Sequence, residues 1–149
     1  MTITGARAVA HLSAEELVEV FVAYVLPFAV AEAEFYVGGA VGVDTAALEW
    51  LAGETKAAVT VVVPRTVRDQ PDVASRAIMK WHEAGRLKEL VELDIDEVGI
   101  DGYLARNRWM VDRSDLVIGF PRSGDQGSGT GYTLGYAASQ GKALLVAPI

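Results

Sequence analysis

The fold of this chain is decided by the stretch Ala57-Ala58-Val59-Thr60-Val61-Val62-Val63, which ends at Pro64-Arg65. The stretch is an almost unbroken run of β-branched residues with no alternation of apolar and polar positions. Such a run is typical of a parallel strand whose two faces are both covered, because each face then needs apolar side chains. We therefore expect a parallel sheet with helices packed on both faces.

Strand and helix signals alternate on either side of this run. Further strands are expected at 2–4, 35–37, 90–93, 115–120 and 143–146. Helices are expected at 13–33, 44–52, 71–84, 101–113 and 130–140. This alternation predicts an α/β fold in which residues 1–149 form a single Rossmann-like domain, with a doubly wound, mostly parallel sheet and helices on both faces.

Several residues indicate where the helices begin and end. Ser13 and Glu16 have the spacing of a capping box, which predicts a helix that starts at Ser13. Pro27 is a candidate kink in that helix, because proline removes a backbone hydrogen bond. Gly53 and Gly85 are expected just past the ends of two later helices.

Composition restricts the class of protein. The chain has 149 residues, a net charge of −7 and no cysteine, and 51% of its residues are hydrophobic. These values exclude a disordered chain, a disulfide scaffold and a thiolate metal site. The acidic balance argues against a nucleic-acid partner, which usually needs a basic surface. We expect a cytoplasmic protein with no cofactor and no metal site.

The longest apolar run, residues 17–33, does not have the character of a membrane span. Glu19, Pro27 and Glu32 interrupt it, and a spanning helix needs about 20 predominantly apolar residues. No signal peptide is apparent at the N-terminus, so no membrane association is expected. A helix that is apolar on nearly every side is expected to be buried in the domain or against a second copy, which favours a homo-oligomer.

Glycine-rich loops follow three of the expected strands. In doubly wound sheets, ligands bind outside the carboxyl ends of the strands, and a glycine loop before a helix places unpaired N–H groups there. This arrangement predicts a site for a small nucleotide-like anion, although each loop taken alone could serve only a turn. The residues expected to bind the ligand are Gly5, Arg7, Gly38, Gly39, Asp44, Arg106, Gly127, Ser128, Gly129 and Thr130.

Two of these residues have alternative interpretations. Asp44 could accept a hydrogen bond from a sugar hydroxyl, or it could cap the helix that follows. Arg106 could read a phosphate, or it could belong to a solvated face, because Arg108 and Arg113 lie in the same segment. The chain contains neither the phosphate-binding loop of standard NTPases nor the dinucleotide fingerprint, which makes an NTPase or a nicotinamide dehydrogenase unexpected.

The order of these motifs resembles a known superfamily. Residues 38–47, Gly-Gly-Ala-Val-Gly-Val-Asp-Thr-Ala-Ala, resemble the GGARGIDTAAH-type stretch of the DNA-processing protein A family. Gly5-Ala6-Arg7, Arg106-Asn107 and the tail from Ser128 to Pro148 resemble other parts of the same Rossmann-like domain. The resemblance covers nearly the whole chain and extends to the SLOG superfamily, which also contains the "lonely guy" phosphoribohydrolases.

This resemblance implies a nucleotide or nucleotide-derived ligand on the glycine loops. The phosphoribohydrolases carry a PGGxGTxxE motif, in which the glycines bind phosphate and the glutamate is catalytic. Residues 127–130 match the phosphate half, but the glutamate position falls on Thr133. A threonine cannot act as a base near neutral pH, and the carboxylates that could substitute in these loops are Asp44 and Asp125.

The sequence therefore supports three hypotheses of function. The preferred one is a nucleotide-binding sensor or carrier. The second is an enzyme that hydrolyses or transfers at the N-glycosidic bond of a nucleotide, with catalytic residues that the sequence does not identify beyond Asp44 and Asp125. The third is a DNA-handling module, which the net charge of −7 makes the least favoured.

Overall fold

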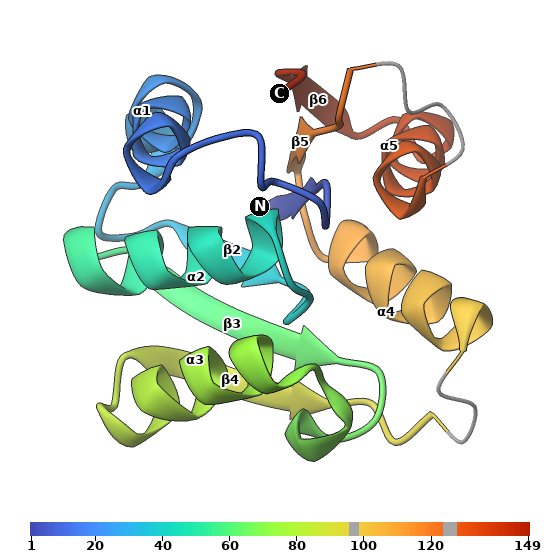
Figure 1. Cartoon of the computed structure of the whole chain (residues 1–149). Helices are drawn as coiled ribbons and strands as arrows, with labels where there is room; N and C mark the ends of the chain where they lie inside the picture. The colour runs from blue at the N-terminus through green and yellow to red at the C-terminus, as the bar shows by residue number, and fades with distance from the viewer. Residues whose placement is uncertain (96–98, 124–127) are drawn as a thin grey trace.

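The computed structural model describes residues 1–95, 99–123 and 128–149 and shows an α/β fold (Figure 1). One six-stranded sheet, in the order β4-β3-β2-β1-β5-β6, has every neighbouring pair parallel. The strands are β1 (Thr2–Gly5), β2 (Glu34–Val37), β3 (Ala58–Val63), β4 (Leu87–Glu92), β5 (Leu116–Phe120) and β6 (Ala143–Val146). The helices are α1 (Ala14–Tyr24), α2 (Val43–Glu54), α3 (Asp72–Glu83), α4 (Ile100–Asp112) and α5 (Gly129–Ser139).

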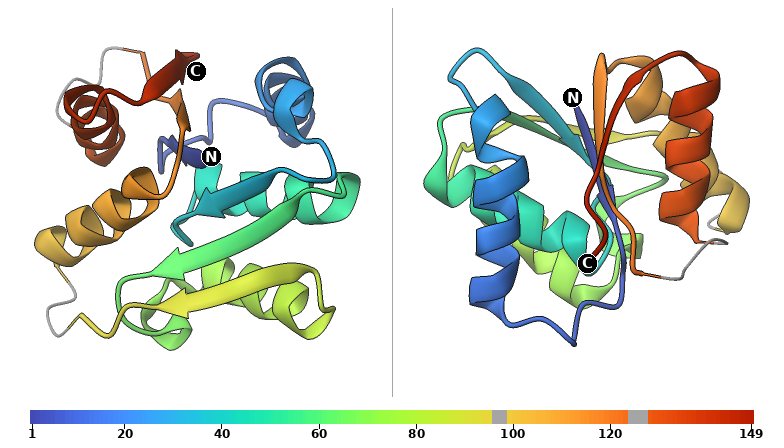
Figure 2. Two further views of the ribbon diagram at one scale, coloured as in Figure 1. Left: turned by 180° about the vertical axis from the view of Figure 1, so that it is seen from behind. Right: turned by 90° about the horizontal axis from the view of Figure 1, so that it is seen from above.

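The helices form two layers around the sheet. Figure 2 shows α1, α2 and α3 on one face and α4 and α5 on the other. This division follows from the strand order: the chain adds β2, β3 and β4 to one side of β1, then crosses to add β5 and β6 to the other side. Because parallel crossovers are right-handed, the reversal of direction puts the later helices on the opposite face. The doubly wound, Rossmann-like prediction is thus confirmed, and the sheet is entirely parallel.

The main core lies between the sheet and the layer of α1, α2 and α3. Phe21 of α1, Phe35 of β2 and Phe120 of β5 are fully buried in it. A smaller apolar cluster on the opposite face consists of Val111 of α4, Val117 of β5 and Ala137 of α5. Burying each large side chain contributes about 1.5–3 kcal/mol, so the β-branched strands hold both layers in place.

The first helix is much shorter than the sequence predicts. The predicted capping box at Ser13 is present, but α1 ends at Tyr24 instead of residue 33. Val25 caps it by donating its N–H to the Phe21 carbonyl at 2.8 Å. Pro27 lies in a separate short 3₁₀ turn, η1 (Leu26–Phe28), so it follows the helix end and does not kink the helix.

The apolar residues of α1 and η1 are only partly covered by the domain. Leu17 and Phe21 are buried, whereas Val18, Val22 and Leu26 are exposed by 42%, 46% and 47%. Among the described residues, no helix combines the length and apolarity that crossing a membrane requires.

Of the two glycines predicted to follow helix ends, Gly85 does so and Gly53 does not. Gly85 has a φ of 67° just after α3, as predicted, because a left-handed residue there closes the helix. Gly53 instead lies inside α2, which continues to Glu54. The end of α2 is set by Thr55, whose N–H and hydroxyl both donate to the Leu51 carbonyl.

Candidate functional site

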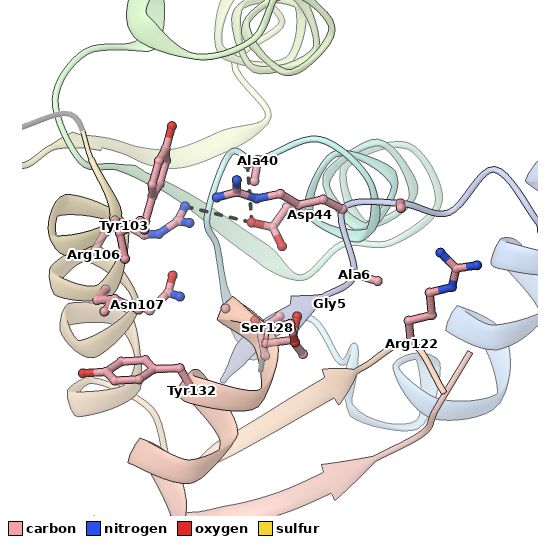
Figure 3. A pocket seen from close by; sticks show the side chains of 17 residues that line it. Gly5, Ala6, Ala40, Asp44, Tyr103, Arg106, Asn107, Arg122, Ser128 and Tyr132 are labelled. Carbon is pink, nitrogen blue, oxygen red and sulfur yellow. Dashed lines mark hydrogen bonds and ion pairs between the residues drawn. The ribbon is translucent and has the colours of Figure 1, made fainter. Parts of the chain in front are cut away.

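A cavity of about 580 Å³ opens where the strand order reverses, between the carboxyl ends of β1 and β5. This is the position at which doubly wound sheets bind their ligands. Figure 3 shows its walls, which come from the loop after β1, the start of α2, one side of α4 and the start of α5.

The amino terminus of α5 forms one wall. Ser128 is its N-cap, and the Ser128 hydroxyl accepts a hydrogen bond from the Gly131 N–H at 3.2 Å. Gly129 and Thr130 are the first two residues of the helix, so their N–H groups have no intrahelical acceptor by position. Both residues line the cavity, so their N–H groups and the positive end of the helix dipole are available to an anion.

Three arginines reach the cavity from different elements. Arg7 follows β1, Arg106 lies in α4, and Arg122 follows β5. The Arg7 guanidinium lies 4.7 Å from the centre of the Tyr103 ring, which holds it across the cavity by a cation–π contact. The parallel strand ends thus gather cations that are far apart in the sequence.

Arg106 is the most unusual of the three because it is only 3% exposed. Its Nη1 donates to the Val62 carbonyl at 3.2 Å, but its buried Nε has no hydrogen-bond partner among the described residues. A buried donor without an acceptor is costly, by about 1–3 kcal/mol. The interpretation of this arginine as part of a solvated face is therefore wrong.

Asp44 in the first turn of α2 is the counter-charge of Arg106. Its Oδ2 lies 3.9 Å from Arg106 Nη1 and accepts a hydrogen bond from the Ala40 N–H at 3.4 Å. Burial raises the pKa of Asp44, and the Arg106 charge opposes that shift. Burial likewise lowers the pKa of Arg106, against the effect of Asp44. The described lining carries three arginines and one carboxylate, so it is locally positive in an acidic protein.

Of the two glycines after β2, Gly38 makes room for this pair of side chains. A Cβ on Gly38 would lie 2.0 Å from Arg106 Nη1 and 2.6 Å from Asp44 Oδ2, so only glycine leaves room for them. Gly39 has a φ of 64°, and its Cα faces the core at Val63. Neither glycine lines the cavity, although both were expected to allow a ribose or a base to approach.

The residues that the sequence predicted for the site fall into three groups in the structure. Gly5, Arg7, Asp44, Arg106, Ser128, Gly129 and Thr130 all line the cavity, as the residues predicted to bind the ligand would need to. Gly38 and Gly39 lie behind it. Asp125 and Gly127 lie outside the described residues.

Thr133, which occupies the position of the phosphoribohydrolase glutamate, does not line the cavity. Its hydroxyl is fully buried, accepts from Asn107 Nδ2 at 2.8 Å and donates to the Gly129 carbonyl at 2.8 Å. This hydroxyl therefore joins α4 to α5, and both of its hydrogen-bonding functions are used inside the protein.

Sequence reasoning identified Arg106 on α4 but missed the rest of the wall that this helix contributes. Ile100, Tyr103, Leu104 and Asn107 line the cavity from one side of this helix, and Tyr132 of α5 faces them. Their spacing of three and four residues could have revealed a shared helix face. Ile100, the first residue of α4, is 78% exposed and so lines the cavity without contributing to the core.

A comparison with protein-family models gave no match for this chain, and a comparison with curated proteins gave none either. The function is therefore inferred from the geometry of the cavity.

Proposed function

We propose that this protein binds a nucleotide or nucleotide-derived ligand in the cavity between α4 and α5, as a sensor or carrier. The observation that carries the proposal is the buried Arg106, whose Nε has no hydrogen-bond partner within residues 1–95, 99–123 and 128–149, in a cavity that the amino terminus of α5 also lines. An anion between the two would be paired with the guanidinium and with helix N–H groups.

Each part of the lining suits one part of such a ligand. The Gly129 and Thr130 N–H groups would hold a phosphate, and Arg7 or Arg106 would pair its charge. Asp44 would accept a hydrogen bond from a ribose hydroxyl, and Tyr103 would offer an aromatic surface to a base. The volume of about 580 Å³ lies within the usual range for small-molecule sites.

The order of motifs supports the same proposal. On that basis we also propose membership of the SLOG superfamily, whose glycine loops imply a nucleotide ligand. The homo-oligomer and the cytoplasmic location stay predictions.

Thermal unfolding with AMP, ADP-ribose, NAD, ribose 5-phosphate and unphosphorylated adenosine tests the proposal. A ligand at about 100 times its Kd adds roughly 2.7 kcal/mol of stability, which raises the Tm of a chain of this size by about 5–10 °C. We expect at least one phosphorylated compound to give such a shift and adenosine to give none.

A matched pair of arginine variants locates the binding. Arg7→Gln removes a cation that lines the cavity, whereas Arg76→Gln removes an exposed cation of α3. The Tm shift should fall in Arg7→Gln and persist in Arg76→Gln. The proposal is abandoned if no compound in the panel raises the Tm, or if the two variants respond alike.

Asp44 favours a second candidate function, hydrolysis of the N-glycosidic bond of a nucleotide. It is a carboxylate that lines the cavity, and burial raises its pKa, which suits a group that accepts or donates a proton. Hydrolysis would break the C1′–N bond, form a C1′–O bond from water and release the base with a proton. Chromatography of AMP incubated with the protein should then show adenine, and Asp44→Asn should prevent its release.

A further inference from the structure

A second hollow lies on the opposite helix layer, between α1 and α2. Its volume is about 590 Å³, and we call it the α1–α2 groove. Figure 1 shows these two helices side by side on the same face of the sheet. The residues that line it are Ala14, Leu17, Val18, Phe21, Val22, Leu26, Ala46, Glu49, Trp50 and Glu54.

The floor and one edge of this groove are apolar. Phe21 and Trp50 form the floor, with ring centres 5.7 Å apart. Val18, Val22 and Leu26 form the edge on α1 and η1, at a spacing of four residues, and each is more than 40% exposed. Exposed apolar side chains in a row, beside a hollow, are the mark of a surface that another chain covers.

Acidic side chains border the groove. Glu49 and Glu54 line it from α2, and helical spacing puts Glu15 and Glu19 of α1 on the side of Val18 and Val22. Lys80 pairs with Glu49 at 2.6 Å. Within the described residues, the other three have no ion pair with a Lys or Arg side chain.

The two helices that form the groove carry no Lys or Arg of their own. Residues 8–55, which include both helices, have eight Asp and Glu and no Lys or Arg. The rest of the chain has all 13 Lys and Arg against 12 Asp and Glu. Residues 8–55 therefore carry a net charge of −8, and the rest of the chain carries +1.

We propose that the α1–α2 groove is the docking site of an amphipathic helix of a partner protein, with an apolar face bordered by Lys and Arg. A helix laid in an apolar groove buries side chains at every third or fourth position, which matches the row of Val18, Val22 and Leu26. The acidic border selects basic flanks. A second copy fits less well, because an interface between two such grooves would bring the same acidic borders together.

A synthetic peptide of about four helical turns, with leucines on one face and lysines at its borders, is a direct probe. Its controls are a peptide with glutamate in place of lysine and one with serine in place of leucine. Fluorescence anisotropy should detect binding of the leucine–lysine peptide alone. That binding should weaken as salt screens the acidic border.

Two variants with the same change of charge separate docking in the groove from general attraction to an acidic protein. Val22→Asp places an acid in the groove, whereas Val73→Asp places one at an exposed position of α3 outside it. Docking predicts binding weakened about tenfold by Val22→Asp, the loss of roughly one apolar anchor, and left unchanged by Val73→Asp. Both sites are exposed, so thermal unfolding should show that both variants fold.

The proposal is overturned by any of three results. The peptide does not bind, or it binds Val22→Asp as tightly as Val73→Asp, or the wild type is a dimer in native mass spectrometry that only Val22→Asp dissociates. The last result would assign the groove to a second copy of the chain.

Discussion

The cavity at the carboxyl ends of β1 and β5 and the α1–α2 groove have nearly the same volume, about 580 and 590 Å³, and opposite chemistry. The cavity between α4 and α5 gathers three arginines and the amino terminus of a helix. The α1–α2 groove gathers valine, leucine and aromatic side chains with a border of glutamates. One is suited to a small anion and the other to an apolar, basic segment of a chain.

The difference follows from where each hollow lies in the fold. The cavity lies at the carboxyl ends of the strands, where every following helix begins and its N–H groups point inward. The groove lies along the flanks of two helices, where backbone groups are already paired and only side chains decide what binds. The net charge of −7 for the whole chain therefore does not indicate the local charge of the cavity or of the groove.

Of the variants considered, Arg106→Met should have the largest effect on stability and on ligand binding in the cavity. It should have no effect on peptide binding in the α1–α2 groove. Removing one partner of a buried ion pair leaves Asp44 uncompensated and costs about 3 kcal/mol. The Tm shift by the phosphorylated ligand should disappear, and binding of the leucine–lysine peptide should persist. Urea denaturation measures the loss of stability. Arg76→Met, at an exposed position of α3, should change stability by less than about 0.5 kcal/mol.

Gly38→Ala should disturb the cavity more mildly, through Arg106. The new Cβ would lie 2.0 Å from Arg106 Nη1, so the guanidinium must move, at a cost of about 2 kcal/mol. Gly135→Ala is the matched control, because nothing lies within 4 Å of its Cβ and α5 should gain about 0.5–1 kcal/mol. In thermal unfolding, we expect Gly38→Ala to lower the Tm and Gly135→Ala to raise it. Equal effects would show that Arg106 does not need the space at Gly38.

Asp44→Asn leaves Arg106 without its counter-charge, just as Arg106→Met leaves Asp44 without one, and its distinct signature is a smaller effect on the pH dependence of stability. Because burial raises the pKa of Asp44 above its ordinary value of 3.8, the folded state holds this proton more tightly than the unfolded state. The carboxyl therefore contributes most below pH 3.8, and the wild type should lose stability relative to Asp44→Asn as pH rises through the folded pKa. Urea denaturation at a series of pH values measures this difference. If the wild type instead gained stability relative to Asp44→Asn as pH rises, the effect of the Arg106 charge on the pKa of Asp44 would outweigh that of burial.

The parallel sheet could be predicted because its signal is local. Residues 57–63 carry apolar side chains for both faces, and the structure has β3 at Ala58–Val63. The end of the first helix could not be predicted, because residues 25–33 are mostly apolar like the residues before them. Only the hydrogen bond at Val25 and the turn at Pro27 show that the helix ends at Tyr24. For the site, the loops at Gly5 and Ser128 were predictable from their glycines, whereas the wall at Tyr103 depends on how α4 packs.

By itself, the sequence determined the alternation of strands and helices, the glycine loops and the separation of acidic residues 8–55 from the cations, because these depend on neighbouring residues. Only the tertiary structure decided that Arg106 is buried opposite Asp44 and that Gly38 makes room for both. Arg106 and Gly38 are 68 positions apart, and no local pattern records a contact between them. Parallel strands bring such residues together because each strand ends at the same edge of the sheet.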